Sequence, residues 1–139
     1  MRLKNYRFRK SERLCSKKAI EALFEGGHPS VSVYPVRAVF MLRDAATPQS
    51  PAQDGAEGMH QVLISVSKRH FKHAVDRNRV KRQLREAYRL NRHLLVDGLP
   101  EATSLSMAFI WLSDDLFPSP VVQNKMQKLL LRIRESCRS

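Results

Sequence analysis

Long apolar runs, glycine-rich phosphate loops and targeting signals are missing from this 139-residue chain. No apolar stretch approaches the roughly 18 residues that a membrane-spanning helix needs, and the basic N-terminus lacks the apolar core of a secretory signal. Gly26 and Gly27 are the only adjacent glycines, and no flanking Gly–Lys pattern makes them a nucleotide-binding loop. We therefore expect a cytoplasmic protein with no membrane role, folded as one domain over residues 1–139.

Cysteine is nearly absent as well. Cys15 and Cys137 lie near opposite ends of the chain and have neither CxxC nor zinc-site spacing. Two free thiols in a reducing cytoplasm are the favoured interpretation, and a single disulfide joining the two ends is the alternative.

Acidic residues are few and scattered. A metal-dependent nuclease needs clustered carboxylates that hold two cations about 4 Å apart. His70 and His73 have HxxH spacing, but no third ligand is close to them in sequence. The aspartates fall mostly at expected turns and at the ends of elements: Asp44, Asp54, Asp76, Asp97, Asp114 and Asp115. The sequence therefore predicts no catalytic residue and no metal site in the protein itself.

Basic residues, in contrast, are in large excess. Lys and Arg number 25 against 13 acidic residues, which gives a net charge of +12. Such an excess implies an anionic partner, either a nucleic acid or an acidic membrane surface. Without an apolar anchor in the chain, the nucleic acid is favoured.

The hydrophobic pattern predicts an α+β fold in the order α-β-β-β-α-β-α. We expect a single small sheet of about four strands that is covered by helices, with its uncovered face available to a ligand. A basic arm over residues 1–13 and a flexible loop over 44–60 lie outside these elements. The expected elements are a helix over 17–25, strand structure within 31–43, a strand over 61–67, a helix over 74–96, a strand over 105–112, and a helix that begins at Ser119. Pro35 either divides the stretch 31–43 into two strands or confines its start to a sheet edge.

The central helix has two distinct faces. At about 100° per residue, its mostly apolar side falls within one arc of roughly 100°, and its cations fall within another, centred about 120° away. The apolar arc holds Val80, Leu84, Ala87, Tyr88, Asn91 and Leu95. The second arc holds Asn78, Lys81, Arg82, Arg85, Arg89 and Arg92. With Arg77 and Arg79 from the same run of cations, and with Lys68, Arg69 and Lys72 from the basic connection before the helix, it predicts a phosphate-binding surface. A merely solvated face is the alternative.

A second site is expected around the first helix. Aromatic and apolar residues alternate there with cations, a pattern typical of single-stranded nucleic-acid binding. The apolar members are Phe8, Ile20, Phe24 and Phe40, and the cations are Arg7, Arg9, Arg13, Lys17 and Lys18. The alternative is that these aromatic side chains simply fill the core.

The segments SVSKR at 65–69 and AVDRNRVKRQLREAYR at 74–89 resemble the signature of the bacterial ribonuclease P protein family, whose central helix carries an Arg-Asn-Arg motif. Upstream, Arg13-Leu14, Ile20, Phe24 and the paired glycines are similar to that family's first helix. The similarity covers about residues 6–135. The sequence differs from the family pattern at two places. Phe71-Lys72-His73 stands where many relatives have a glycine before the helix, and Ile20 stands where an aromatic residue is common.

This resemblance implies a fold similar to certain ribosomal protein domains, with a left-handed βαβ crossover through the central helix, against the usual right-handed rule. It also implies a protein cofactor for a catalytic RNA that removes the 5′ leader of precursor tRNA. Magnesium would be held mainly by the RNA, and we expect the free protein to be a monomer. The cations of the central helix would contact the RNA. The leader would lie in a cleft between the first helix and the sheet. The residues that would line this cleft are Arg13, Lys17, Ile20, Phe24, Ala38, Phe40, Ser65 and Ser67.

Two rival functions remain open at this point. A ribosomal or assembly protein would use the same fold and the same cations without taking part in cleavage. A DNA-binding regulator would place the basic helix in a major groove.

Overall fold

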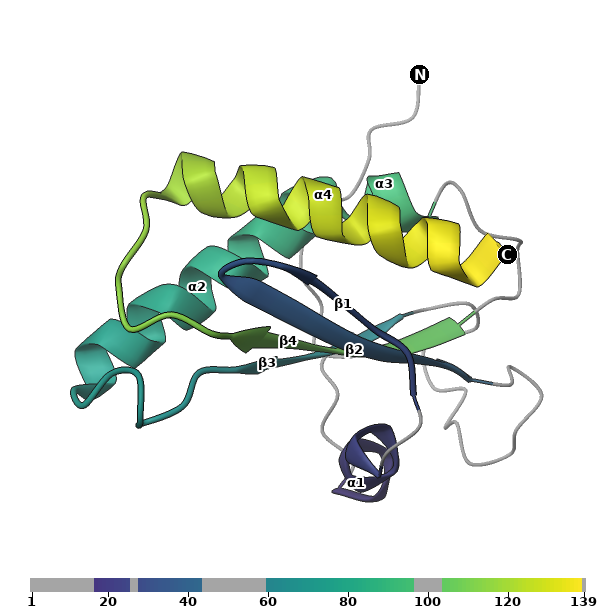
Figure 1. The fold of residues 1–139 in the computed structure, drawn as a ribbon, viewed down its shortest axis with the longest axis horizontal. Coiled ribbons are helices and arrows are strands. Elements are labelled where there is room, and N and C mark those ends of the chain that lie inside the picture. The colour runs from purple at the N-terminus through teal and green to yellow at the C-terminus, as the bar shows by residue number, and fades with distance from the viewer. Residues whose placement is uncertain (1–16, 26–27, 44–59, 97–103, 139) are drawn as a thin grey trace.

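The computed structural model of the chain describes residues 17–25, 28–43, 60–96 and 104–138 (Figure 1). The predicted arm at 1–13 and nearly all of the predicted loop at 44–60 lie outside these residues. The described elements follow the predicted order, with one short helix added: α1 (Lys17–Phe24), β1 (Ser30–Val33), β2 (Val36–Arg43), β3 (Gln61–Ser65), α2 (Ala74–Asn91), α3 (His93–Val96), β4 (Ser104–Trp111) and α4 (Ser119–Arg138).

The four strands form one mixed sheet in the order β1-β2-β4-β3. β1 and β2 make an antiparallel hairpin, and β2 pairs antiparallel with β4 along its whole length, from Val36 opposite Trp111 to Arg43 opposite Ser104. Pro35 stands in the hairpin turn between β1 and β2, as predicted, because proline has no N–H to give to a strand ladder.

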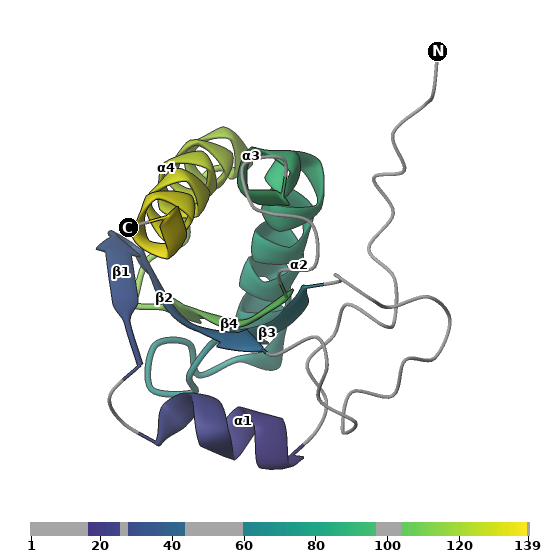
Figure 2. The same ribbon diagram turned by 90° about the vertical axis from the view of Figure 1, so that its right-hand side faces the viewer.

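Helices cover both faces of this sheet. Figure 2 shows α2 and α4 side by side on one face and α1 alone on the other. The predicted α+β architecture with a single small sheet is therefore confirmed. Among the described residues, no helix combines the length and apolarity that a bilayer crossing requires.

The connection from β3 to β4 has unusual handedness. These two strands are parallel neighbours, and α2 lies between them in the chain. Figure 2 looks along the sheet from the end where both strands begin, so that both recede from the viewer. The chain rises from β3 into α2 and then descends to β4 on the left of β3, which makes the crossover left-handed. The handedness implied by the resemblance is thus confirmed, against the usual rule for such units.

The main core lies between the sheet and the α2–α4 layer. From α2 it takes the predicted apolar side, which is buried as expected: Val80, Leu84, Ala87, Tyr88 and Asn91. From α4 it takes the stripe of Val122, Met126, Leu129, Leu130 and Ile133. Each such aliphatic side chain contributes about 1.5–3 kcal/mol when it is fully buried. Burial of one side of α2 in this core necessarily turns its opposite side outward.

The predicted helix over 74–96 is divided after Asn91 into α2 and the single-turn α3. The side-chain amide of Asn91 donates a hydrogen bond to the carbonyl oxygen of Ala87 at 2.8 Å. Its own side-chain oxygen accepts one from Gln127 of α4 at 3.0 Å. Leu95 N–H bonds to Arg92 O, three residues back, at 3.0 Å. These local bonds replace the regular helical ladder at the break.

Candidate nucleic-acid interface

The outward side of α2 presents guanidinium groups to solvent. Arg79 and Arg82 are exposed, and neither has a hydrogen bond or ion pair with another described residue. Asn78 is also exposed, whereas Lys81, Arg85 and Arg92 are half-buried. The positive charges of Arg79 and Arg82, near the centre of α2, are therefore accessible to an anionic partner.

A hollow of about 430 Å³ lies beside these arginines, between α2 and the start of α4. Gln83, which lines the hollow, donates from its amide to Phe117 O at 2.8 Å and to Ser119 Oγ at 3.1 Å. These two bonds tie the middle of α2 to the beginning of α4. The lining residues are Arg79, Arg82, Gln83, Arg85, Glu86 and Ser119.

Two other predicted cations have partners inside the protein. Arg77 donates from Nη1 to Phe71 O at 2.8 Å and to Lys72 O at 3.1 Å, so it holds the loop that precedes its own helix. Arg89 makes an ion pair with Glu86 one turn earlier. The hydrogen bond from Arg89 lowers the pKa of the Glu86 carboxyl and raises the pKa of Arg89. The sequence pattern could not single out Arg77, because its carbonyl partners exist only in the folded loop. The pair of Glu86 and Arg89 has the i,i+3 spacing of a helical ion pair, a signal that the sequence did contain.

The loop over residues 66–73 carries further predicted contacts. Lys68, Arg69 and Lys72 are exposed on it. The hydroxyl of Ser67 accepts a hydrogen bond from Arg69 N–H at 3.0 Å, and Ser67 O accepts from the N–H groups of His70 and Phe71 at 3.1 and 3.3 Å. The ring of Phe71 is buried. The loop is therefore internally bonded, and its cations project from a defined backbone.

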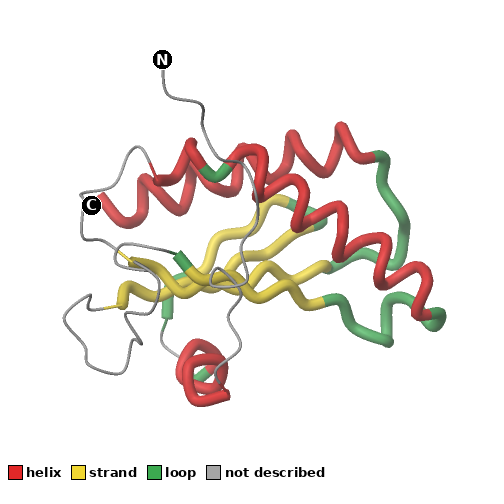
Figure 3. Tube along the Cα trace, turned by 180° about the vertical axis from the view of Figure 1, so that it is seen from behind, coloured by secondary structure: helices red, strands yellow, loops and turns green. Residues whose placement is uncertain are grey.

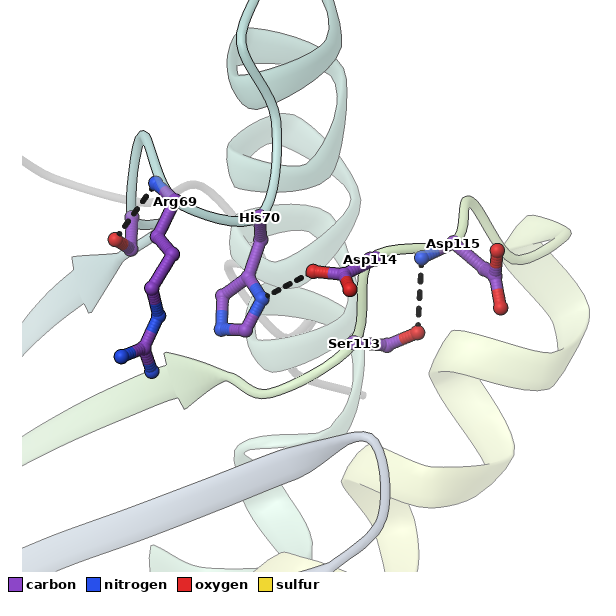
Figure 4. A network of polar contacts seen from close by, with 6 residues as sticks. Arg69, His70, Ser113, Asp114 and Asp115 are labelled. Carbon is purple, nitrogen blue, oxygen red and sulfur yellow. Dashed lines mark hydrogen bonds and ion pairs between the residues drawn. The ribbon is translucent and has the colours of Figure 1, made fainter.

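A side-chain hydrogen bond fastens this loop to the loop between β4 and α4. His70 Nδ1 lies 2.7 Å from Asp114 Oδ1 (Figure 4). Figure 3, from behind, shows the two loops at the same end of the sheet. The sequence analysis missed this contact because 44 residues separate the partners. Among the described residues, no three His, Cys, Asp or Glu side chains come together in a way that could hold a metal ion.

The face of the sheet toward α1 is a second surface. Leu23 of α1 packs there on Val39 and Ala108 in a small buried cluster. Half-buried apolar side chains surround this cluster: Ile20, Met41, Leu63 and Ile110. Phe24 at the end of α1 keeps 46% of its surface exposed. Ser65 follows Leu63 on the same side of β3 because side chains alternate along a strand.

The prediction that Ala38 and Phe40 line this surface is wrong. Both are buried in the main core, with exposed fractions of 0% and 2%, on the face covered by α2 and α4. The residues of β2 that face α1 are Arg37, Val39 and Met41. A one-residue shift along a strand exchanges its faces. The sequence held a signal for the right assignment, because Arg37 and Arg43 alternate with Val39 and Met41, whereas the other set of alternating residues is wholly apolar.

The remaining predicted residues of this surface fall into three groups. Ile20 and Ser65 lie on it, half-buried, and Ser67 is exposed just beyond the end of β3. Lys17 begins α1. Arg13 lies outside the described residues. Arg37, which the sequence analysis did not include, is exposed on this face and its guanidinium lies 3.4 Å from Ser30 Oγ.

Comparison with known proteins agrees with this architecture. The family model for ribonuclease P matches residues 8–134. The chain is 42% identical over 125 residues to the ribonuclease P protein component of Porphyromonas gingivalis, covering 89% of this chain and 84% of that protein. It is 33% identical over 136 residues to the ribonuclease P protein component of Chlorobium phaeobacteroides, covering 92% and 88%.

Solved structures show the same fold. The RNase P protein from Thermotoga maritima superposes with a TM-score of 0.62 at 20% identity, over 87% of this chain and 96% of that one. The Staphylococcus aureus RNase P protein gives 0.61 at 19% identity, over 90% and 97%. With the outward cations of α2 and the left-handed crossover, these matches lead to one conclusion: the chain belongs to the ribonuclease P protein family.

Proposed function

We propose that this chain is the protein subunit of ribonuclease P and that it promotes endonucleolytic maturation of the 5′ end of tRNA. One observation carries the proposal beyond family membership. The arginines at the centre of α2 are exposed because the opposite side of the same helix is locked into the core. Cations held in this way on a rigid helix are suited to neutralise phosphates of an RNA.

The catalytic RNA is the partner that we assign to α2 and the loop before it. Arg79 and Arg82, with Lys68 and Arg69, present cations from a single continuous stretch of backbone. Arg77 and the His70 ring hold that backbone in place through their bonds to neighbouring loops. The RNA therefore meets charges that are already positioned, and less ordering entropy is lost on binding.

The 5′ leader of precursor tRNA is the partner that we assign to the sheet face beside α1. This face combines an exposed aromatic ring, half-buried apolar groups and an exposed cation: Phe24, then Ile20 and Met41, then Arg37. Such a surface stacks bases and neutralises the backbone without reading sequence. Ser65 and the loop after β3 connect this face directly to α2, so one RNA complex can contact both.

Cleavage itself is assigned to the RNA. The described residues offer no group of side chains suited to hold the metal ions of a phosphodiester hydrolysis. We propose that magnesium is held mainly by the RNA, and that the protein's net charge of +12 screens repulsion between RNA and substrate. The free protein acts in the cytoplasm as a monomer.

Reconstitution tests this function. The purified chain is added to its catalytic RNA and precursor tRNA at low magnesium, where the RNA alone is slow. We expect the protein to restore cleavage at the 5′ end of the mature sequence, and we expect no cleavage when the RNA is omitted. A ribosomal or assembly protein would bind RNA without restoring cleavage, and either that result or efficient cleavage by the protein alone would refute the proposal.

The leader assignment has its own test. In Phe24→Ala, the affinity for precursor tRNA should fall, while the affinity for mature tRNA should stay the same, because only the precursor carries a leader. Val75→Ala is the matched control: Val75 is also exposed, at 75%, but lies in α2, away from this face. An equal loss with both tRNAs would count against leader contact.

A further inference from the structure

Tyr34 is an aromatic residue to which the proposed function assigns no role. It lies in the turn between β1 and β2, and 60% of its surface is exposed, more than for any other Phe, Tyr or Trp of the described residues. Leu116, in the loop between β4 and α4, is also exposed at 39%. Singly exposed apolar residues are common on protein surfaces, so exposure alone assigns no role to Tyr34, and the way its ring is held decides the matter.

The ring of Tyr34 rests on an aromatic column. It packs edge-on against Phe117, with ring centres 6.5 Å apart and planes at 70°. Phe117 packs in the same manner on Trp111, at 5.4 Å and 82°, and Trp111 is fully buried. The turn itself is fastened to the end of β4 by a hydrogen bond from Leu112 N–H to Pro35 O at 2.8 Å. Tyr34 is therefore held in one position with much of its surface open to solvent.

The same column leads to the arginine hollow on α2. Phe117, which supports Tyr34, accepts a hydrogen bond through its carbonyl oxygen from Gln83 at 2.8 Å. Gln83 lines the hollow together with Arg79 and Arg82. Figure 1 places the β1–β2 turn, the β4–α4 loop and the beginning of α2 at one end of the molecule. The segment from Phe117 to Ser119 therefore contributes to both features: Phe117 supports the ring of Tyr34, and Ser119 lines the arginine hollow.

We propose that Tyr34 stacks on an unpaired base of the catalytic RNA whose backbone passes the arginine hollow. This inference rests on the proposed function and adds a contact outside α2. A base offers a π face to the ring, and its phosphates suit the neighbouring guanidinium groups. A second copy of the chain is a poor occupant, because each copy carries a net charge of +12. A ring that served only to cover Phe117 would be replaceable by an aliphatic side chain.

Three substitutions in the full chain separate these roles. Tyr34→Phe keeps the π face, Tyr34→Leu keeps the apolar cover over Phe117 without a π face, and Tyr34→Ala removes both. Binding to the catalytic RNA alone, without tRNA, is measured at several salt concentrations. We expect Tyr34→Phe to bind within about twofold of the unaltered protein, and both Tyr34→Leu and Tyr34→Ala to bind roughly 5- to 100-fold more weakly, the range for loss of one stacked base.

The salt dependence identifies the cause of any loss. Removing a stacked base leaves the number of neutralised phosphates unchanged, so the slope of log K against log salt should stay the same in Tyr34→Leu. An affinity of Tyr34→Leu equal to that of the unaltered protein would overturn the inference, and so would a loss seen only with a leader-bearing substrate. If the unaltered protein fails to bind the RNA at all, the proposed function fails instead.

Fluorescence gives an independent measurement. Trp111 is the only tryptophan of the chain and is fully buried. In Tyr34→Trp, a second indole takes the exposed position, and stacking on a base should quench its emission when the catalytic RNA is added. The unaltered protein provides the background from Trp111. Emission that does not change more than this background would contradict base stacking at this turn.

Discussion

Arg77 is expected to stabilise the folded protein, although it stands in the middle of the most basic segment of the chain. Its guanidinium donates to two backbone carbonyls, Phe71 O at 2.8 Å and Lys72 O at 3.1 Å. Hydrogen bonds from a charged donor contribute roughly 1.5–3 kcal/mol, and the value falls when the pair is open to water. Only the bond to Phe71 is partly buried. Loss of a cation from the first turn of α2 also returns a few tenths of a kcal/mol through the helix dipole.

The net effect of Arg77→Ala should therefore be a loss of about 1–2 kcal/mol in the free energy of unfolding. In a chain of this size, that corresponds to a decrease in Tm of roughly 4–8 °C. Arg79→Ala is the matched control, because it removes the same charge two residues away on the same helix, from a side chain without a described partner. It should change the free energy of unfolding by less than about 0.5 kcal/mol.

Urea denaturation at fixed salt measures both variants without any RNA. If Arg77→Ala and Arg79→Ala unfold at the same urea concentration, the two carbonyl bonds contribute nothing and the reasoning is refuted. If only Arg77→Ala is destabilised, a loss of RNA binding in that variant must be corrected for its lower stability before it is interpreted as a lost phosphate contact.

Three further predictions follow from the described contacts. Arg82→Ala should lower the salt slope of RNA binding by about 0.7–0.9, the value for one lost phosphate contact, and an unchanged slope in a filter-binding series would exclude that contact. His70→Gln and Asp114→Asn should each weaken RNA binding, because the 2.7 Å hydrogen bond between these two side chains holds the loop before α2. The double variant should lose less than the sum of the two single losses, and strictly additive losses would show that the pair is uncoupled. Partial burial raises the pKa of the Cys137 thiol, so alkylation at neutral pH in Cys15→Ser should be slower than for a model thiol. The rate should continue to rise with pH beyond the point where a model thiol is fully ionised, and urea should increase it.

The state of the cysteines is settled only for one of them. Cys137 is a free, half-buried thiol near the end of α4, as the favoured interpretation of the sequence predicted. Cys15 lies outside the described residues.

Local periodicity was sufficient to predict the elements and the two sides of α2. A helix turns by a nearly constant angle per residue, so the positions of Val80, Leu84 and Tyr88 on one side, and of Arg82 on another, follow from their spacing alone. The break at Pro35 was predictable for an equally local reason, since proline cannot donate to a strand ladder. These predictions needed no knowledge of what lies opposite in the fold.

Contacts between distant segments were decided only by the tertiary structure. Alternation along β2 groups Ala38 with Phe40, and Val39 with Met41, Arg37 and Arg43. The two arginines mark the second face as the more polar one, but that α1 nevertheless covers part of it is decided only by the packing. The pairing of His70 with a residue 44 positions away likewise leaves no trace in spacing. The sequence by itself determined that a helix would carry a row of cations, because helical geometry is local. The tertiary structure decided which of those cations are bound internally, because a partner such as a loop carbonyl exists only once the chain has folded.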